Sequence, residues 1–127
     1  MEGRFLVEGP VDGTALVLIE PLSFWGGLDP STGEVVEANH PQRGQVVTGR
    51  ILVMPSGRGS SSSATVLAES IRLGTGPAAI VLGEADEIIA TGALVAEALY
   101  GVTTAVYLAS QDSYAAIRED DLIAFVP

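Results

Sequence analysis

The fold is decided by the stretch Met54-Pro55-Ser56-Gly57-Arg58-Gly59-Ser60-Ser61-Ser62-Ser63-Ala64-Thr65. An apolar run, Ile51–Met54, leads into this stretch and is typical of a buried strand. The segment after it, Ala64–Leu73, has apolar side chains at helical spacing, and Gly74 stands where a helix-ending glycine is expected. A glycine-rich turn therefore joins a strand to a helix. Four serines lie at the helix start, where unpaired N–H groups and the helix dipole favour an anion.

The composition predicts one folded domain, residues 1–127. The hydrophobic fraction is 47% and the mean hydropathy is +0.39, which argues against disorder. No apolar run approaches the roughly 20 residues that span a bilayer, and Met1–Arg4 lacks a signal-peptide pattern. We therefore expect a soluble, cytoplasmic protein.

Charge and residue usage exclude several classes of function. The formal charge of −10 disfavours nucleic acids and anionic membranes as partners. The chain has no lysine, which excludes Schiff-base chemistry and a Walker A loop. It has no cysteine either, which excludes a thiolate nucleophile and a cysteine-held metal cluster. The single histidine, His40, cannot form a zinc site without carboxylates. We expect no metal or cofactor site within this chain alone.

The rest of the chain predicts an α/β or α+β domain with helices on a mixed sheet. A second helix is expected over Glu87–Tyr100, capped by Asp86 and ended by Gly101, with an apolar stripe of Ile88, Gly92, Val95 and Leu99. Asp12-Gly13 is a turn signal between the first two strands, and Gly49 is expected to divide or bend the segment Gln45–Met54. The remaining expected strands are Phe5–Gly9, Ala15–Ile19, Ala78–Leu82, Thr103–Leu108 and Leu122–Val126.

The serine turn admits two interpretations. In the first, Ser60 is a reactive hydroxyl whose oxyanion the helix start stabilises. Gly57 and Gly59 then let the backbone approach a ligand, and Arg58 holds a carboxylate or phosphate. In the second, the serines cap a tight turn, which is the commoner role of serine at such a position. No Ser-His-Asp arrangement is evident, so the pattern does not indicate a hydrolase triad.

The irregular segment Pro21–Gly44 is long for a loop in a compact domain, which is typical of functional segments. Its bulky apolar side chains, Leu22, Phe24 and Trp25, argue against disorder. Trp25 is expected to cover the core. His40 is either a ligand donor or a loop residue without a functional role.

The motifs together resemble those of one known family. Gly57-Arg58-Gly59-Ser60-Ser61 resembles the serine loop of the aconitase swivel domain. Over nearly its full length the chain is similar to the small subunit, or swivel domain, of the aconitase X family. The features that carry this resemblance are Ser23-Phe24-Trp25-Gly26-Gly27-x-Asp29-Pro30-x-Thr32-Gly33, His40-Pro41, Gly49 to Ser61, and Glu84 to Tyr100.

The resemblance implies a swivelling β/β/α domain and a hydro-lyase in which Ser60 is the general base. It implies substrate contacts for Gly57, Arg58, Gly59, Ser61, Ser62 and His40. The aconitase loop continues with an arginine where this chain has Ser62, which leaves Arg58 as a substitute for binding a substrate carboxylate. Known activities of the family are dehydration of cis-3-hydroxy-L-proline and of phosphomevalonate. The serine run is similar to the hydroxyproline type.

The resemblance also implies a heterodimer. The family uses an iron–sulfur or iron centre as a Lewis acid, and because this chain lacks cysteine, the ligands are expected in a large partner subunit. The chain alone is then inactive, and its substrate is a small hydroxy acid. Two alternatives from other classes stay open, namely a non-catalytic anion-binding module and an interaction domain whose serines only cap a helix.

Overall fold

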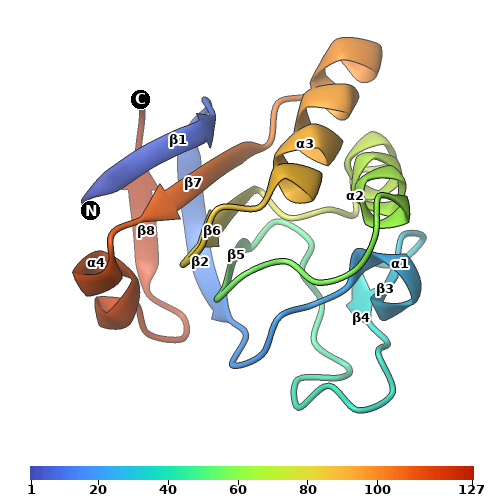
Figure 1. The fold of residues 1–127 in the computed structure, drawn as a ribbon, viewed down its shortest axis with the longest axis horizontal. Coiled ribbons are helices and arrows are strands. Elements are labelled where there is room, and N and C mark those ends of the chain that lie inside the picture. Colours follow the sequence, from blue (N-terminus) through green and yellow to red (C-terminus); the bar gives the residue numbers. More distant parts are fainter.

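The computed structural model describes residues 1–127 and contains eight strands and four helices (Figure 1). The strands are β1 (Gly3–Val7), β2 (Val11–Val17), β3 (Leu28–Asp29), β4 (Glu34–Val35), β5 (Ile51–Met54), β6 (Ala79–Leu82), β7 (Ala105–Ala109) and β8 (Leu122–Phe125). The helices are α1 (Phe24–Gly27), α2 (Ser62–Leu73), α3 (Glu87–Tyr100) and α4 (Gln111–Ala116).

Six strands form one mixed sheet in the order β1-β7-β6-β5-β2-β8. The four strands β2, β5, β6 and β7 are parallel, and the two edge strands β1 and β8 run antiparallel to their neighbours. The carboxyl ends of the parallel strands therefore meet at one edge of the sheet, which is where ligands of such sheets are usually bound. This architecture confirms the predicted fold class.

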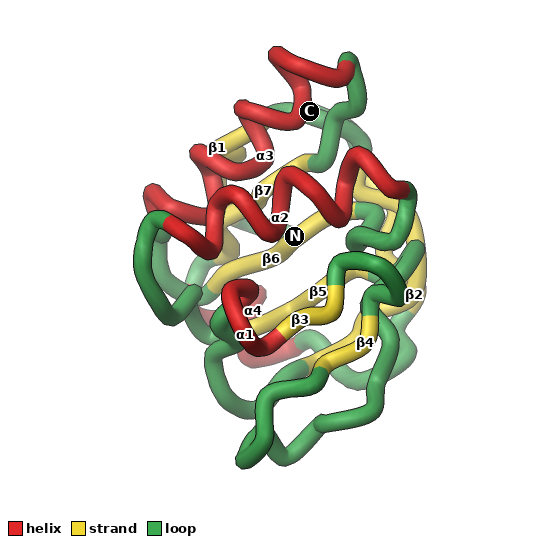
Figure 2. The backbone as a smooth tube through the Cα atoms, turned by 90° about the vertical axis from the view of Figure 1, so that its right-hand side faces the viewer, coloured by secondary structure: helices red, strands yellow, loops and turns green.

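Each face of the sheet carries its own core. Leu52, Met54, Ile80 and Leu82 point toward α2 and α3, which lie across one face (Figure 2). Val53, Val81 and Tyr107 belong to the second core, against which Tyr114 of α4 and its neighbour Ile117 pack. Because β5 and β6 are buried on both faces, they read in the sequence as continuous apolar runs.

Helix α2 confirms the predicted helix after the serine turn. It ends at Leu73, and Gly74 follows in the left-handed conformation with φ of 77°, the geometry that glycine adopts without a steric penalty. Leu67, Ala68 and Ile71 are buried as the spacing predicts.

Helix α3 has the predicted ends, but of its predicted apolar stripe only Gly92 lies on the buried face. Asp86 caps the helix by accepting a hydrogen bond from the Ile89 N–H at 3.0 Å, and Gly101 ends it. The buried face consists of Ile89, Gly92, Ala93 and Ala96. Ile88 is half-buried, and Val95 and Leu99 are exposed. The buried face carries mostly small residues, and the absence of a side chain at Gly92 lets α3 approach α2 closely.

The predicted turn at Asp12-Gly13 is also wrong. Both residues lie within β2, where Gly13 pairs with Ile123 of β8. The chain instead turns between Val7 and Val11, at Gly9-Pro10. Proline lacks the backbone donor that a sheet ladder requires, so the break falls there.

Two further segments refine the sequence-based expectations. Gly49 does divide Gln45–Met54, since only β5 is a strand, and Val46 forms a single bridge with Glu34. Helix α4 was not predicted because it is short. Its start nevertheless follows a capping signal, since the Ser110 hydroxyl accepts from the Ser113 N–H at 3.2 Å. None of the four helices combines the length and the apolar character needed to cross a membrane.

The long segment Pro21–Gly44 is ordered by short elements and by one turn. It contains α1, which lies beside α2, and the β3–β4 hairpin, which follows α1 (Figure 1). Asp29 forms the turn before β4 by accepting from the Ser31 hydroxyl at 2.7 Å and from the Ser31 N–H at 2.9 Å. These hydrogen bonds favour the charged carboxylate and hold the pKa of Asp29 below its usual value.

The contact between α2 and α3 depends on Gly92. A Cβ atom at this position would lie 2.9 Å from the Ala64 carbonyl oxygen and 3.1 Å from the Ala64 Cα, both of them backbone atoms. We expect Gly92→Ala to lower the free energy of unfolding by about 0–2 kcal/mol, because overpacking of about 1–3 kcal/mol outweighs a gain in helix propensity of about 1 kcal/mol. Chemical denaturation measures the effect.

The exposed Ala98 on the same helix supplies the control. Ala98→Gly changes only the helix propensity and should lower stability by about 0.5–1 kcal/mol. A Gly92→Ala protein that is about 1 kcal/mol more stable than the wild type would show that the helices can separate without loss.

Candidate functional site

The loop of residues 55–61, called the serine loop below, connects β5 to α2 at the edge of the sheet where the parallel strands end. Gly57 forms a parallel bridge with Leu22, which joins the loop to the segment that leads into α1. The Pro55 carbonyl accepts from the N–H groups of Gly83 and Glu84 at 3.1 and 2.9 Å. The loop is therefore attached on one side to the Pro21–Gly44 segment and on the other to the turn after β6.

Both loop glycines are required by packing within the chain. A Cβ atom on Gly57 would lie 2.4 Å from Asp86 Oδ2. Gly59 has φ of +111°, and a Cβ atom there would lie 2.6 Å from Ser23 Oγ and 2.8 Å from Ser63 Oγ. The sequence interpretation assigned these glycines to ligand approach. In the structure their first role is to let three other elements approach the loop.

The four serines have two different environments. Ser63 is 2% exposed, and its hydroxyl accepts from the Trp25 N–H at 3.3 Å and lies 3.5 Å from Ser23 Oγ. Ser60, Ser61 and Ser62 are exposed. Ser61 occupies the N-cap position of α2 but makes no side-chain cap, unlike Asp86 and Ser110 at α3 and α4. The side-chain capping that offered the simplest explanation of the serine run is thus not observed.

The backbone N–H groups of the three exposed serines also lack hydrogen-bond acceptors within the chain. Ser60 and Ser61 use their carbonyls to accept from the N–H groups of Ser63 and Ala64 at 2.9 and 3.1 Å, but their own N–H groups, and that of Ser62, have no acceptor in the chain. These donors lie at the positive end of α2. The arrangement suits an anion or a developing negative charge next to the Ser60 hydroxyl.

Arg58 forms an ion pair with Glu37, from the Pro21–Gly44 segment. The other oxygen of the Glu37 carboxylate accepts from the Ser23 N–H at 3.3 Å. Glu37 thus connects Arg58 of the serine loop to Ser23, at the start of α1. The Arg58 side chain keeps 45% of its surface exposed, so its guanidinium remains accessible to a ligand.

Trp25 lies next to the serine loop but does not cover the core as predicted. It is 63% exposed, and its backbone is bound to Ser63, whereas Phe24 beside it is 1% exposed and fills the core. The Trp25 ring is therefore available at the surface, whereas its backbone is tied to the start of α2.

The structure does not give His40 a free nitrogen. The residue is 5% exposed; Nδ1 accepts from the Gln42 N–H at 3.0 Å, and Nε2 lies 3.2 Å from the Glu20 carbonyl oxygen. An accepting Nδ1 places the proton on Nε2, which then donates to Glu20. In this conformation His40 holds the loop together, and its contact with substrate stays a prediction.

The residues of the chain do not fit a metal centre. No three histidine, aspartate or glutamate side chains lie close enough together to hold an ion, and the chain has no cysteine. The side chains of this chain alone therefore do not form a metal-binding site.

The site contains two residues that sequence reasoning missed, Glu37 and Ser23. Glu37 carries no local signal, and Ser23 entered the sequence analysis only as part of the Ser23–Gly33 motif, with no role in the site. Both lie in the irregular segment Pro21–Gly44, far from the serine loop in sequence. The fold alone brings them to Arg58 and Ser63.

Comparison with known proteins identifies the class to which this fold and site belong. The sequence profile of the aconitase X swivel domain matches residues 1–126. The structure superimposes on the crystal structure of holo aconitase X from Thermococcus kodakaraensis with a TM-score of 0.85 and 34% sequence identity, covering 97% of this chain and 88% of that one. The chain belongs to the aconitase X swivel domain family.

Two curated relatives within this family are named for different activities. The chain is 50% identical over 98 residues to a cis-3-hydroxy-L-proline dehydratase of Pseudomonas aeruginosa, covering 77% of this chain and 17% of that protein. It is 43% identical over 96 residues to a phosphomevalonate dehydratase small subunit of Thermococcus onnurineus, covering 76% of this chain and 74% of that subunit. The match therefore spans about a sixth of the first relative and about three quarters of the second.

The division among the serines leads to a stability prediction. Ser63→Ala leaves the Trp25 N–H without its acceptor and should lower the free energy of unfolding by about 1–3 kcal/mol. Ser62→Ala, at an exposed position, should change it by no more than about 0.5 kcal/mol. Denaturation followed by fluorescence measures both, because Trp25 is the only tryptophan. Equal effects of the two substitutions would contradict this assignment.

Proposed function

We propose that this chain is the swivel subunit of an aconitase-X-type hydro-lyase that dehydrates cis-3-hydroxy-L-proline, with Ser60 as the general base. The observation that carries the proposal is the exposed Ser60 hydroxyl, which has no partner in the chain and stands at the start of α2 beside three unpaired N–H groups. A large partner subunit completes the active site.

Dehydration requires a base for a carbon-bound proton and an acid for the leaving hydroxyl group. Ser60 takes the proton from the carbon next to the substrate carboxylate. The electrons of that C–H bond form the C=C bond, and the bond between carbon and the hydroxyl oxygen breaks. The hydroxyl group leaves with that bond's electron pair, and an acidic group of the large subunit supplies the proton that converts it to water. A serine is ordinarily too weak an acid to serve as an alkoxide, so it needs donors that stabilise the oxyanion. The N–H groups at the start of α2 are suited to that task.

The exposure of Ser60 explains why the chain is proposed to be inactive alone. In open water, hydration of an alkoxide competes with the protein donors, and the effect of the helix terminus is screened. A partner subunit that covers the loop excludes water and strengthens each of these interactions. In the proposed complex, Trp25 lies at the edge of the covered region.

The remaining loop residues hold the substrate. Ser61 and Ser62 contribute hydroxyl and N–H donors, and Gly57 and Gly59 keep the loop free of Cβ atoms. Arg58 binds the substrate carboxylate, for which a guanidinium is well suited. His40 reaches the substrate only if it gives up one of its two hydrogen bonds. Iron, or an iron–sulfur cluster, is proposed for the large subunit because this chain lacks a suitable donor set.

The alternative substrate is phosphomevalonate. The 50% identity to the hydroxyproline enzyme, against 43% to the phosphomevalonate subunit, supports the first choice. Charge supports it as well. A phosphate group calls for several basic groups, whereas the serine loop carries one arginine, and Glu37 already neutralises part of its charge.

The first test is turnover of cis-3-hydroxy-L-proline by the chain co-expressed with its large subunit. Ser60→Ala should lower kcat by about 100–10,000-fold, the usual contribution of a general base, while the complex still assembles. Ser113→Ala, on α4 across the sheet, is the control and should stay within about twofold of the wild type.

Three outcomes would change the proposal. An assembled Ser60→Ala complex with near wild-type turnover would remove Ser60 as the base. A wild-type complex that acts on phosphomevalonate instead would change the substrate. A chain that forms no complex, yet binds phosphate or acetate through the unpaired N–H groups, would favour the non-catalytic anion-binding module.

The role of Arg58 can be tested separately. Arg58→Gln should raise KM by about 10–100-fold with a smaller effect on kcat, because the lost hydrogen bonds are made to a charged carboxylate. Glu37→Gln removes the ion pair but leaves the guanidinium, and should raise KM much less. Equal increases in the two variants would show that Arg58 acts only by holding Glu37.

A further inference from the structure

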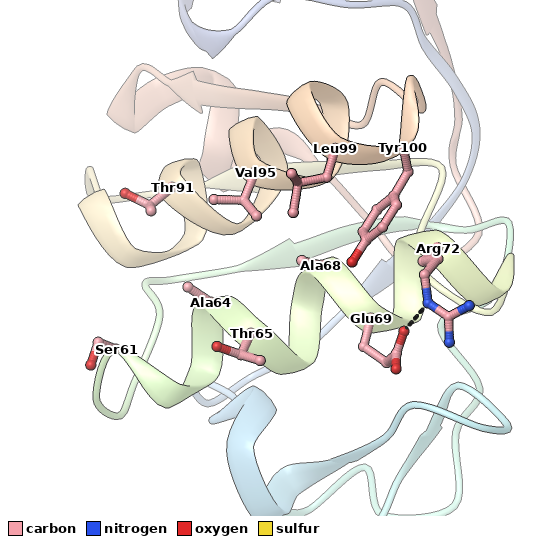
Figure 3. Close-up of a pocket in the computed structure, with 10 residues that line it drawn as sticks. All are labelled: Ser61, Ala64, Thr65, Ala68, Glu69, Arg72, Thr91, Val95, Leu99 and Tyr100. Carbon is pink, nitrogen blue, oxygen red and sulfur yellow. Dashed lines mark hydrogen bonds and ion pairs between the residues drawn. The ribbon is translucent and has the colours of Figure 1, made fainter.

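A groove of about 450 Å³ runs between α2 and α3 on the outer surface of the domain (Figure 3). Its α2 wall includes Ala64 and Ala68, and its α3 wall includes Val95, Leu99 and Tyr100. Figure 3 shows Val95 and Leu99 pointing toward α2, with the Tyr100 ring closing one end. The groove adjoins the buried contact through Gly92, since Ala64 belongs to both, and its Val95 and Leu99 side chains are exposed.

Helix α3 is apolar on more faces than the domain itself can bury. Ile89, Ala93 and Ala96 are buried, yet Leu94, Val95 and Leu99 remain 51%, 39% and 67% exposed. Scattered exposed side chains are ordinary, but Val95 and Leu99 gather with Ala64, Ala68 and Tyr100 in one groove. An exposed apolar groove of this kind favours contact with another molecule. The apolar stripe that the sequence predicted along this helix contributes Val95 and Leu99 to the groove.

The groove is continuous with the serine loop. Ser61 lines one end of the groove, and the opposite end is formed by Tyr100 and Arg72 (Figure 3). Ser61 also lines an adjoining hollow that extends to Glu87 and Ile88 at the start of α3. A molecule that covers the exposed hydroxyl of Ser60 therefore reaches the open end of the groove.

The charge of the two helices indicates the chemistry of the occupant. Together they carry three carboxylates, Glu69, Glu87 and Glu97, against one guanidinium, that of Arg72, which Glu69 neutralises. The chain as a whole has a formal charge of −10. A complementary surface has an apolar ridge for the groove and basic side chains on either side of it.

The domain arrangement of one related protein supports the view that another part of the same enzyme fills the groove. In the Pseudomonas aeruginosa dehydratase the matching 98 residues make up 17% of one chain. In that protein the domain is covalently joined to a much larger remainder, so it has a neighbour on which to pack. A docking face on the swivel domain is thus expected whether the two parts are fused or separate.

We propose that the α2–α3 groove is the docking site for the large subunit, which inserts an apolar ridge flanked by basic side chains. This inference rests on the proposed function, since it takes the large subunit as the occupant. The ridge fixes the domain along α2 and thereby holds the large subunit over the serine loop at the N-terminal end of the same helix.

The test measures the affinity of the purified chain for the large aconitase X subunit of the same organism. Leu99→Glu and Val95→Glu each place a carboxylate in the groove and should weaken binding by at least about 30-fold, as for other interface hot spots. Leu122→Glu is the matched control. Leu122 is 86% exposed on β8, an edge strand remote from α2 and α3, and this variant should bind like the wild type.

Two further measurements test whether a loss of binding comes from misfolding and whether charge contributes to association. Leu99 is 67% exposed, so Leu99→Glu should retain the circular dichroism spectrum and unfolding midpoint of the wild type. The contribution of charge is tested with Glu97→Arg, which should slow association, with the greatest effect at low salt.

Each outcome decides between the groove and its alternatives. If the wild type assembles and the groove variants bind equally well, the groove inference is wrong while the proposed function stands. If Leu122→Glu alone weakens binding, the β8 edge is the docking face. If the wild type binds no large subunit, both proposals fail. A dimer of this chain that Leu99→Glu dissolves would make a second copy the occupant.

Discussion

The structure depends on the close contact between the serine loop and Asp86. One oxygen of this carboxylate caps α3 at the Ile89 N–H, and the other occupies the space that a Cβ atom on Gly57 would fill. The two parallel units β5–α2 and β6–α3 are thereby held in register at the edge where their strands end. Any side chain at Gly57 would have to displace either the loop or the cap of α3.

The segment Pro21–Gly44 acts on the same loop from the other side. Leu22 bridges to Gly57, Glu37 pairs with Arg58, and Ser63 accepts from the Trp25 N–H. Of the four serines, these contacts use only Ser63. The other three remain exposed with free hydroxyl and N–H groups, so these contacts hold one side of the loop and leave the other side open to solvent. The open side of the loop agrees with the proposed large partner subunit.

The groove extends this description along α2. Small residues, Gly92, Ala93 and Ala96, bring α3 against α2 and the sheet, and this choice turns the large side chains Val95 and Leu99 outward. The orientation of α3 about its own axis thus accounts both for the close packing inside the domain and for the apolar side chains on its surface. The same helix pair that presents the serine loop at one end presents an apolar strip beside it (Figure 3).

The sequence by itself determined the features that depend on neighbouring residues. The ends of α2 and α3 follow from Gly74, Asp86 and Gly101, because caps are local, and the buried strands β5 and β6 follow from continuous apolar runs. The tertiary structure alone decided which face of α3 is buried and which of the four serines is buried and hydrogen-bonded within the chain. It also decided that Glu37 forms an ion pair with Arg58. Those outcomes depend on contacts between segments distant in the chain, and helical periodicity does not distinguish a core-facing stripe from one that faces solvent.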